Sequence, residues 1–172
     1  LTALHYFAGN GPMFLRNFYD KGKRSIQKPR ESGPAAYVFP AGDKRSGFAF
    51  TEPSDAPRPS WAAVDGDHLV ITGQKSYVTG GADADFLVAL VEVEGQGPAM
   101  VVIDTAAPGV TISRRFSSLD GSHHAAFRFD AVRVPRHHAI GAPGDGRSRA
   151  LAKISAVRRA VAADAVGTAA WA

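Results

Sequence analysis

The fold class is indicated most clearly by the stretch His68-Leu-Val-Ile-Thr-Gly-Gln-Lys-Ser-Tyr-Val-Thr-Gly-Gly81. It is rich in β-branched residues, follows the turn residues Asp65-Gly66-Asp67 and ends in two glycines, a pattern typical of strands. Gly73 interrupts it, because glycine in a strand often marks a break or a bend. The sequence therefore predicts two short strands, over residues 68–72 and 75–79.

Similar short apolar segments lie on both sides of this stretch. We expect strands over residues 48–50, 86–93, 100–104, 110–113, 125–130 and 132–134. Phe127 and Phe129 alternate with Arg128, as in a strand with one buried face. Short strands at this spacing, with turn residues between them, predict a mainly β domain over residues 47–142, built as a barrel or sandwich.

The two flanking segments differ from this β-rich middle. Residues 1–46 mix aromatic, basic and proline residues, so we expect an irregular segment of uncertain origin, with a short helix over 13–19 and a strand over 35–39. Residues 146–172 are Ala-rich with apolar residues at helical spacing, and Asp145 is a candidate N-cap. The helical pattern continues to the last residue and the chain begins with Leu, so we expect a fragment of a longer enzyme.

Composition excludes several classes of protein. There is no cysteine, which removes disulfides, thiolate metal sites and a Cys nucleophile, and which agrees with a cytoplasmic location. No apolar run is long enough for a membrane span. Residues 1–50 hold eight Lys/Arg against three Asp/Glu, whereas the rest holds twelve against thirteen. The basic excess is a short solvated cluster around residues 21–24, so we expect no nucleic-acid partner.

Two strand ends have residues suited to a flat ring such as a flavin. Phe48-Ala-Phe-Thr-Glu-Pro53 and Lys75-Ser-Tyr-Val-Thr-Gly-Gly81 each present aromatic or hydroxyl side chains just before a chain breaker. Thr79 lies two residues after Tyr77, on the same side of a strand, so a ring packed on Tyr77 would be within reach of the Thr79 hydroxyl. On spacing alone, ordinary strand ends explain the pattern better than a flavin site does.

Three motifs in order carry a family resemblance. Phe50-Thr-Glu-Pro53, then residues 65–81, then Phe129-Asp-Ala-Val-Arg-Val-Pro135 resemble the middle β-domain of the acyl-CoA dehydrogenase family. The resemblance continues into residues 146–172, which are similar to the first helix of that family's C-terminal helical domain. It implies FAD as cofactor, an acyl-CoA thioester as substrate, hydride transfer to flavin N5, a homo-oligomer, and an electron-transfer flavoprotein or another acceptor as partner.

The resemblance also assigns residues. It implies that Phe48, Phe50 and Thr51 line the flavin, and that Tyr77, Val78 and Thr79 stand where the family has Trp-Ile-Thr beside the ring. The family's small-residue loop after Thr-Glu-Pro is replaced here by residues 54–60, which contain two prolines, and we expect Ser54 and Ser60 to substitute for its substrate contacts.

The resemblance also implies that the chain contains no catalytic base. The family takes the α-proton with a carboxylate from the C-terminal helical domain, beyond residue 172, so the chain is expected to be inactive alone. Residues 119–124 also lack the arginine that the family often has there. A flavin monooxygenase or oxidase variant of the family, or a non-catalytic truncated product, stays open as an alternative.

A second, shorter resemblance concerns the N-terminal segment. Residues 11–25 and 33–41 resemble a segment of large bacterial zinc carboxypeptidases, without that family's His-x-x-Glu zinc motif. A chimera joined near Arg45 and a divergent N-terminal segment are both consistent with it. The paired histidines at 123–124 and 137–138 are adjacent in sequence and place one ring on each face of a strand, so we predict no metal site.

Overall fold

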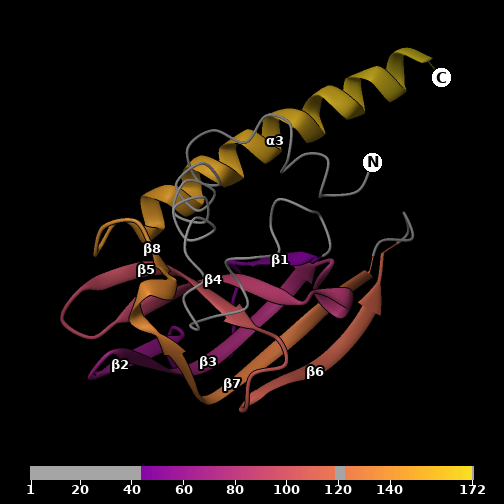
Figure 1. Cartoon of the computed structure of the whole chain (residues 1–172). Coiled ribbons are helices and arrows are strands. Elements are labelled where there is room, and N and C mark those ends of the chain that lie inside the picture. Colours follow the sequence, from indigo (N-terminus) through magenta and orange to yellow (C-terminus); the bar gives the residue numbers. More distant parts are fainter. Residues whose placement is uncertain (1–43, 119–122, 172) are drawn as a thin grey trace.

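The computed structural model describes residues 44–118 and 123–171. The helix expected over 13–19, the strand expected over 35–39 and the segments that resemble carboxypeptidases lie outside the described residues. The described part consists of one β-domain and one long helix (Figure 1). Its elements are β1 Ser46–Ala49, β2 Trp61–Asp65, β3 His68–Thr79, η2 Gly81–Asp83, β4 Phe86–Val93, β5 Gly97–Asp104, β6 Val110–Ser117, β7 His123–Pro135, η3 Arg136–His138, β8 Ala139–Ile140 and α3 Gly146–Trp171.

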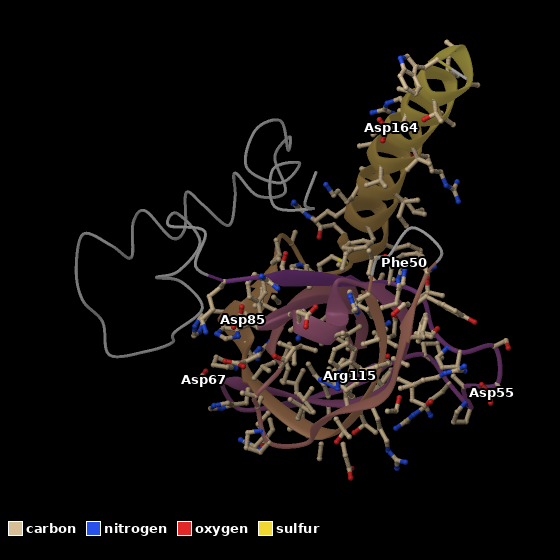
Figure 2. All side chains as sticks on the ribbon, turned by 90° about the vertical axis from the view of Figure 1, so that its right-hand side faces the viewer. Phe50, Asp55, Asp67, Asp85, Arg115 and Asp164 are labelled. Carbon is tan, nitrogen blue, oxygen red and sulfur yellow. The ribbon has the colours of Figure 1, made fainter. Side chains whose placement is uncertain are left out.

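The strands form one sheet in the order β6-β7-β3-β2-β4-β5-β8, with β1 paired to β4 off this path. The β1–β4 and β2–β4 pairs are parallel, and the other pairs are antiparallel. The sheet curls around its own core instead of lying flat, as both views show (Figures 1 and 2). The mainly β, barrel-like fold predicted from the sequence is confirmed.

The main core lies inside the curl and is built from one side of each strand. Phe127 and Phe129 are buried there while Arg128 between them is exposed, as the alternation predicts. Burial of this set of apolar side chains is the main stabilising contribution to the domain. It consists of Ala49, Ala62, Leu69, Ile71, Val78, Leu87, Ala89, Val91, Val93, Ala99, Val101, Ile103, Ala125, Phe127, Phe129, Val132 and Val134.

A second apolar cluster covers the outer face of β4 and β5, which explains why β4 is apolar along nearly its whole length. Phe86, Val88, Leu90, Met100 and Val102 pack there against Ile140 of β8 and Ala150 of α3, and Phe48 and Phe50 pack at the border. This cluster holds the first turns of α3 on the sheet. Beyond those turns the helix extends away from the β-domain (Figure 1).

The predicted strand breaks at Gly73 and at Ala131 are both wrong, because in each place the strand continues through an irregularity. Gly73 does not end a strand: β3 runs through it, with a register shift between Ile71 and Gly73. Facing it, β7 also continues, and Ala131 adopts a φ of 50° while its N–H donates to the Thr72 hydroxyl at 3.3 Å. Such β-bulges bend a strand without ending it.

Gly73 is required by a close approach. A Cβ added there would lie 2.5 Å from the Cα of Ser60, closer than packed atoms allow. The sequence predicts no strand at β2, which begins directly after Ser60 and pairs with β3 through the two-residue turn Gly66-Asp67. Gly73 therefore makes room for the chain that enters β2.

Helix α3 begins at Gly146, as predicted, and runs to Trp171. Asp145 lies just before it: its carboxylate accepts from Arg149 Nε at 2.6 Å and from the Ala142 N–H at 3.3 Å, and its carbonyl accepts from the Arg149 N–H. Ala150 is buried, whereas Leu151 and Val161 of the predicted apolar face are exposed. Within residues 44–118 and 123–171, no helix has the length and apolarity needed to cross a membrane.

Candidate functional site

The two sequence motifs singled out above meet in the structure, although they are far apart along the chain. The end of β1 leads into Thr51, and the Thr51 carbonyl accepts a hydrogen bond of 2.9 Å from the Ser76 N–H of β3. This hydrogen bond places Thr51 beside Ser76, the residue that precedes Tyr77. We call the place where residues 48–51 and 75–79 meet the junction, and the candidate site lies there.

A buried ion pair lies behind the junction. Lys75 Nζ donates to Glu52 Oε1 at 2.6 Å, and the side chains are 1% and 25% exposed, respectively. The same carboxylate oxygen accepts from the Ser60 N–H at 2.8 Å, and the Ser60 hydroxyl donates to the Gln74 carbonyl at 3.1 Å. These contacts bind residues 52–60 to β3 over a sequence separation of 23 residues between Glu52 and Lys75.

The Glu52 carboxylate is ionised at neutral pH because hydrogen-bond donors stabilise its negative charge. Burial raises the pKa of Glu52, but the hydrogen bonds from Lys75 and from the Ser60 N–H, together with the charge of Lys75, outweigh it and hold the pKa below 4.5. Burial lowers the pKa of the Lys75 ammonium, and Glu52 offsets part of that effect.

Tyr77 is the most exposed aromatic residue of the junction. Its φ is 54°, in the left-handed region that bulky residues avoid, and the residue is 68% exposed. The ring meets Phe116 edge-on with centroids 5.5 Å apart, and Phe116 stacks on His124. A register shift between Lys75 and Val78 produces this bulge.

The neighbours of Tyr77 divide between core and surface. Val78 is fully buried, so only its backbone can meet a ligand, whereas Thr79 is exposed like Tyr77. The Ser76 hydroxyl is buried and has no hydrogen-bond partner within the described part of the chain. An aromatic ring and the Thr79 hydroxyl are thus available at one strand end.

The β1 side of the junction contributes Phe48, Phe50 and Thr51. The two phenylalanine rings are parallel, with an interplanar angle of 2° and centroids 6.2 Å apart, and both are partly buried. They lie beside the cluster under α3, and Figure 2 shows Phe50 near the base of that helix. Thr51 is exposed. The six residues expected to line a flavin thus lie on two segments, residues 48–51 and 77–79, which the Thr51–Ser76 hydrogen bond holds close together.

The two serines expected to contact the substrate differ in their exposure. Ser54 is exposed on the projecting loop that carries Asp55 (Figure 2). Ser60 is fully buried, and both its N–H and its hydroxyl already donate within the protein. A buried serine with satisfied donors serves the local fold, so we leave Ser60 out of the proposed site.

Sequence reasoning missed Glu52, Lys75 and Phe116. A lysine inside an apolar strand is a usable signal, because a buried ammonium needs a paired carboxylate. The identity of that carboxylate is set by the fold and not by spacing. Across the residues whose placement is described, no group of three or more His, Asp or Glu side chains is arranged to hold a metal ion.

The fold and the junction define a class: a curled β-domain that displays aromatic and hydroxyl side chains at neighbouring strand ends, with a helix docked beside them. The family model for the acyl-CoA dehydrogenase middle domain matches residues 47–132. The chain belongs to the acyl-CoA dehydrogenase family, whose members are oxidoreductases.

Individual relatives agree with this assignment. A probable acyl-CoA dehydrogenase, FadE10, of Mycobacterium tuberculosis is 36% identical over 137 residues, covering 72% of this chain and 21% of that protein. The human short-chain specific acyl-CoA dehydrogenase of mitochondria is 30% identical over 141 residues, covering 76% of this chain and 34% of that protein. The chain thus spans a fifth to a third of these relatives.

Solved structures share the fold. A probable acyl-CoA dehydrogenase from Mycobacterium abscessus superposes with a TM-score of 0.65 at 31% identity, covering 78% of this chain and 39% of that one. A glutaryl-CoA dehydrogenase from Mycobacterium smegmatis, solved in complex with FADH2, superposes with a TM-score of 0.59 at 24% identity, covering 76% and 36%. At this lower identity the second match speaks for the fold alone.

Proposed function

We propose that residues 47–142 form the flavin-holding β-domain of an FAD-dependent acyl-CoA dehydrogenase, with α3 as the start of its helical part. The observation that carries the proposal is the junction itself. Thr51 and Tyr77 come from motifs more than twenty residues apart, and the fold joins them through the Thr51–Ser76 hydrogen bond. Membership of the family makes a flavin the ligand for which such a junction is suited.

The junction fits the ring portion of FAD. Tyr77 offers a flat, exposed face, and Phe48 and Phe50 offer parallel apolar rings. The exposed hydroxyls of Thr51 and Thr79 can exchange hydrogen bonds with the polar edge of a flavin ring. The backbone strain at Tyr77 is of the kind that proteins retain at ligand sites.

The loop of residues 54–60 offers few backbone donors for the phosphate groups of FAD. Pro57 and Pro59 lack backbone N–H donors, and the N–H of Ala56 already donates to the Pro53 carbonyl at 3.1 Å. We therefore propose that the described residues hold the flavin ring, and that Ser54 is the one loop serine able to meet a substrate.

A bound FAD would supply the hydride acceptor for α,β-dehydrogenation of an acyl-CoA thioester. The chain's own residues would position the ring: Tyr77 packs against it, and Thr79 hydrogen-bonds its edge. We assign no catalytic base to the described residues, because no carboxylate stands among the exposed groups of the junction; Glu52 is occupied by Lys75. The 172 residues alone are therefore proposed to bind flavin without turning over acyl-CoA.

The test is a titration of the purified chain with FAD, followed by flavin fluorescence and by the flavin absorption bands. We expect saturable binding that Thr79→Val weakens about fivefold, since one charge-free hydrogen bond is worth about 1 kcal/mol. Thr111→Val, at an exposed β6 position away from the junction, is the matched control. Absence of binding by the wild-type chain would favour the non-catalytic alternative. An electron-transfer flavoprotein as acceptor and a homo-oligomer are further proposals from the family.

A further inference from the structure

The Glu52–Lys75 pair is the most unusual polar feature of the β-domain, and neither residue is among those proposed to touch the flavin. The lysine side chain is 1% exposed, in a domain whose other long polar side chains mostly reach solvent. Burying two charges is costly, and a well-packed apolar pair often stabilises a core as well or better. The pair therefore points to a role in local geometry more than to a role in stability.

The pair is one of three contacts that join residues 51–60 to residues 74–76, and a fourth contact lies within residues 51–60. Glu52 binds Lys75 and the Ser60 N–H, the Ser60 hydroxyl binds the Gln74 carbonyl, and the Ser76 N–H binds the Thr51 carbonyl. The contact within residues 51–60 is the one from the Ser60 N–H to Glu52, which closes the loop between those two residues. Glu52 lies at the centre, because a single carboxylate oxygen accepts two of these hydrogen bonds.

The backbone next to these four contacts is held in an unfavourable conformation. Tyr77 has a φ of 54° and follows Lys75 by two residues, within the register shift that ends at Val78. Left-handed backbone at a bulky residue persists only where the surroundings determine it. Here Lys75 is anchored on one side by Glu52, and Val78 is anchored on the other by the core.

We propose that the Glu52–Lys75 ion pair is a positioning device for the flavin ring: it fixes the separation of Thr51 from Tyr77 and holds Tyr77 outward. The proposal rests on the proposed flavin site. Both residues act through the backbone of their neighbours and do not touch the ring. Thr51 follows Phe50 and precedes Glu52, so any movement of the carboxylate is passed directly to the residue expected to face the flavin.

The test uses the double variant Glu52→Gln/Lys75→Met, which removes both charges at similar volume and leaves no unpaired ion in the core. The control is Asp65→Asn/Arg133→Gln, which removes an exposed ion pair with side chains 60% and 54% exposed. Two quantities are measured for each protein: amide hydrogen exchange at Ser76 and Tyr77, with Val88 of β4 as the internal reference for intact folding, and FAD affinity with the flavin absorption spectrum.

We expect the double variant to keep protection at Val88, to exchange at Ser76 and Tyr77 at least tenfold faster, and to bind FAD at least tenfold more weakly with shifted flavin bands. The control should match the wild type in all three. Unchanged exchange at Ser76 overturns the proposal, and so does faster exchange with unchanged FAD affinity. If the wild-type chain binds no FAD, the proposed function fails and the ligand half of this inference fails with it; the exchange data then decide the structural half separately.

Discussion

The two ways of breaking the Glu52–Lys75 pair should differ in cost. Glu52→Gln leaves an ammonium whose side chain is 1% exposed, whereas Lys75→Met leaves a carboxylate that is 25% exposed and still accepts from the Ser60 N–H. Water can solvate the second group but not the first. We therefore expect Glu52→Gln to destabilise the domain more than Lys75→Met.

The magnitudes follow from this asymmetry. Removing one partner of a buried pair costs about 3–5 kcal/mol, which we expect for Glu52→Gln. The cost of Glu52→Gln cannot exceed the cost of deprotonating Lys75, because a neutral lysine no longer needs a partner. Neutralising a lysine of ordinary pKa 10.5 at pH 7 costs about 5 kcal/mol, at roughly 1.4 kcal/mol per pH unit. For Lys75→Met the loss is mainly one charge-assisted hydrogen bond, about 1.5–3 kcal/mol.

The assay is urea denaturation of the wild type and both variants at pH 7 and pH 9.5, followed by tryptophan fluorescence. In Glu52→Gln the folded-state pKa of Lys75 lies below the unfolded value, so its penalty is complete at low pH and is lost as pH rises toward 10.5. The deficit relative to wild type should shrink at pH 9.5. Equal costs for the two variants, or a deficit that does not change with pH, would refute the reasoning.

Three further perturbations have outcomes that the structure determines. Gly146→Ala should cost about 1–3 kcal/mol in urea denaturation and loosen the start of α3, because a Cβ there would lie 2.5 Å from Ala99 Cα; a cost near zero would contradict the packing. Tyr77→Gly should stabilise the flavin-free chain by about 1 kcal/mol in thermal denaturation by relieving its left-handed φ, while weakening FAD binding; Tyr77→Ala should weaken binding without the gain. Burial lowers the pKa of His138 below 6.5, although its hydrogen bond with the Val102 carbonyl has the opposite effect. The free energy of unfolding should therefore fall as the pH drops through 6.5. His138→Gln should flatten this pH dependence, and an unchanged pH dependence would exclude His138 as its source.

Most of the strand content could be predicted because it is encoded locally. Residues 86–91 form a continuous apolar run, and β4 has the predicted bounds, 86–93. Phe127 and Phe129 alternate with Arg128 because one face of β7 is buried. Wherever local periodicity and burial coincide, the sequence is sufficient.

The errors have long-range causes. Gly73 looks like a strand end, and only the approach of Ser60 shows that it is a contact point inside a longer strand. The segment that became β2 is short and contains two alanines, which have low strand propensity, so only its pairing with β3 makes it a strand.

The candidate site was predictable only in part. The aromatic and hydroxyl residues could be found from their motifs, since chemistry of that kind is visible in the sequence. The partner of Lys75 could not, because the ion pair forms only when the β1 end and β3 are brought together. The same holds for Ser60, which the sequence suggests as a free hydroxyl and which the fold buries.

The central claim is that the junction of β1 and β3 holds a flavin ring. The most direct measurement is a two-dimensional amide NMR titration of the chain with FAD, using resonances assigned at the junction and at a distant site. We predict saturable shifts at Thr51, Tyr77, Val78 and Thr79, with little change at Arg136 in η3. Absence of shifts at the junction, or saturable shifts confined to other parts of the domain, would contradict the claim.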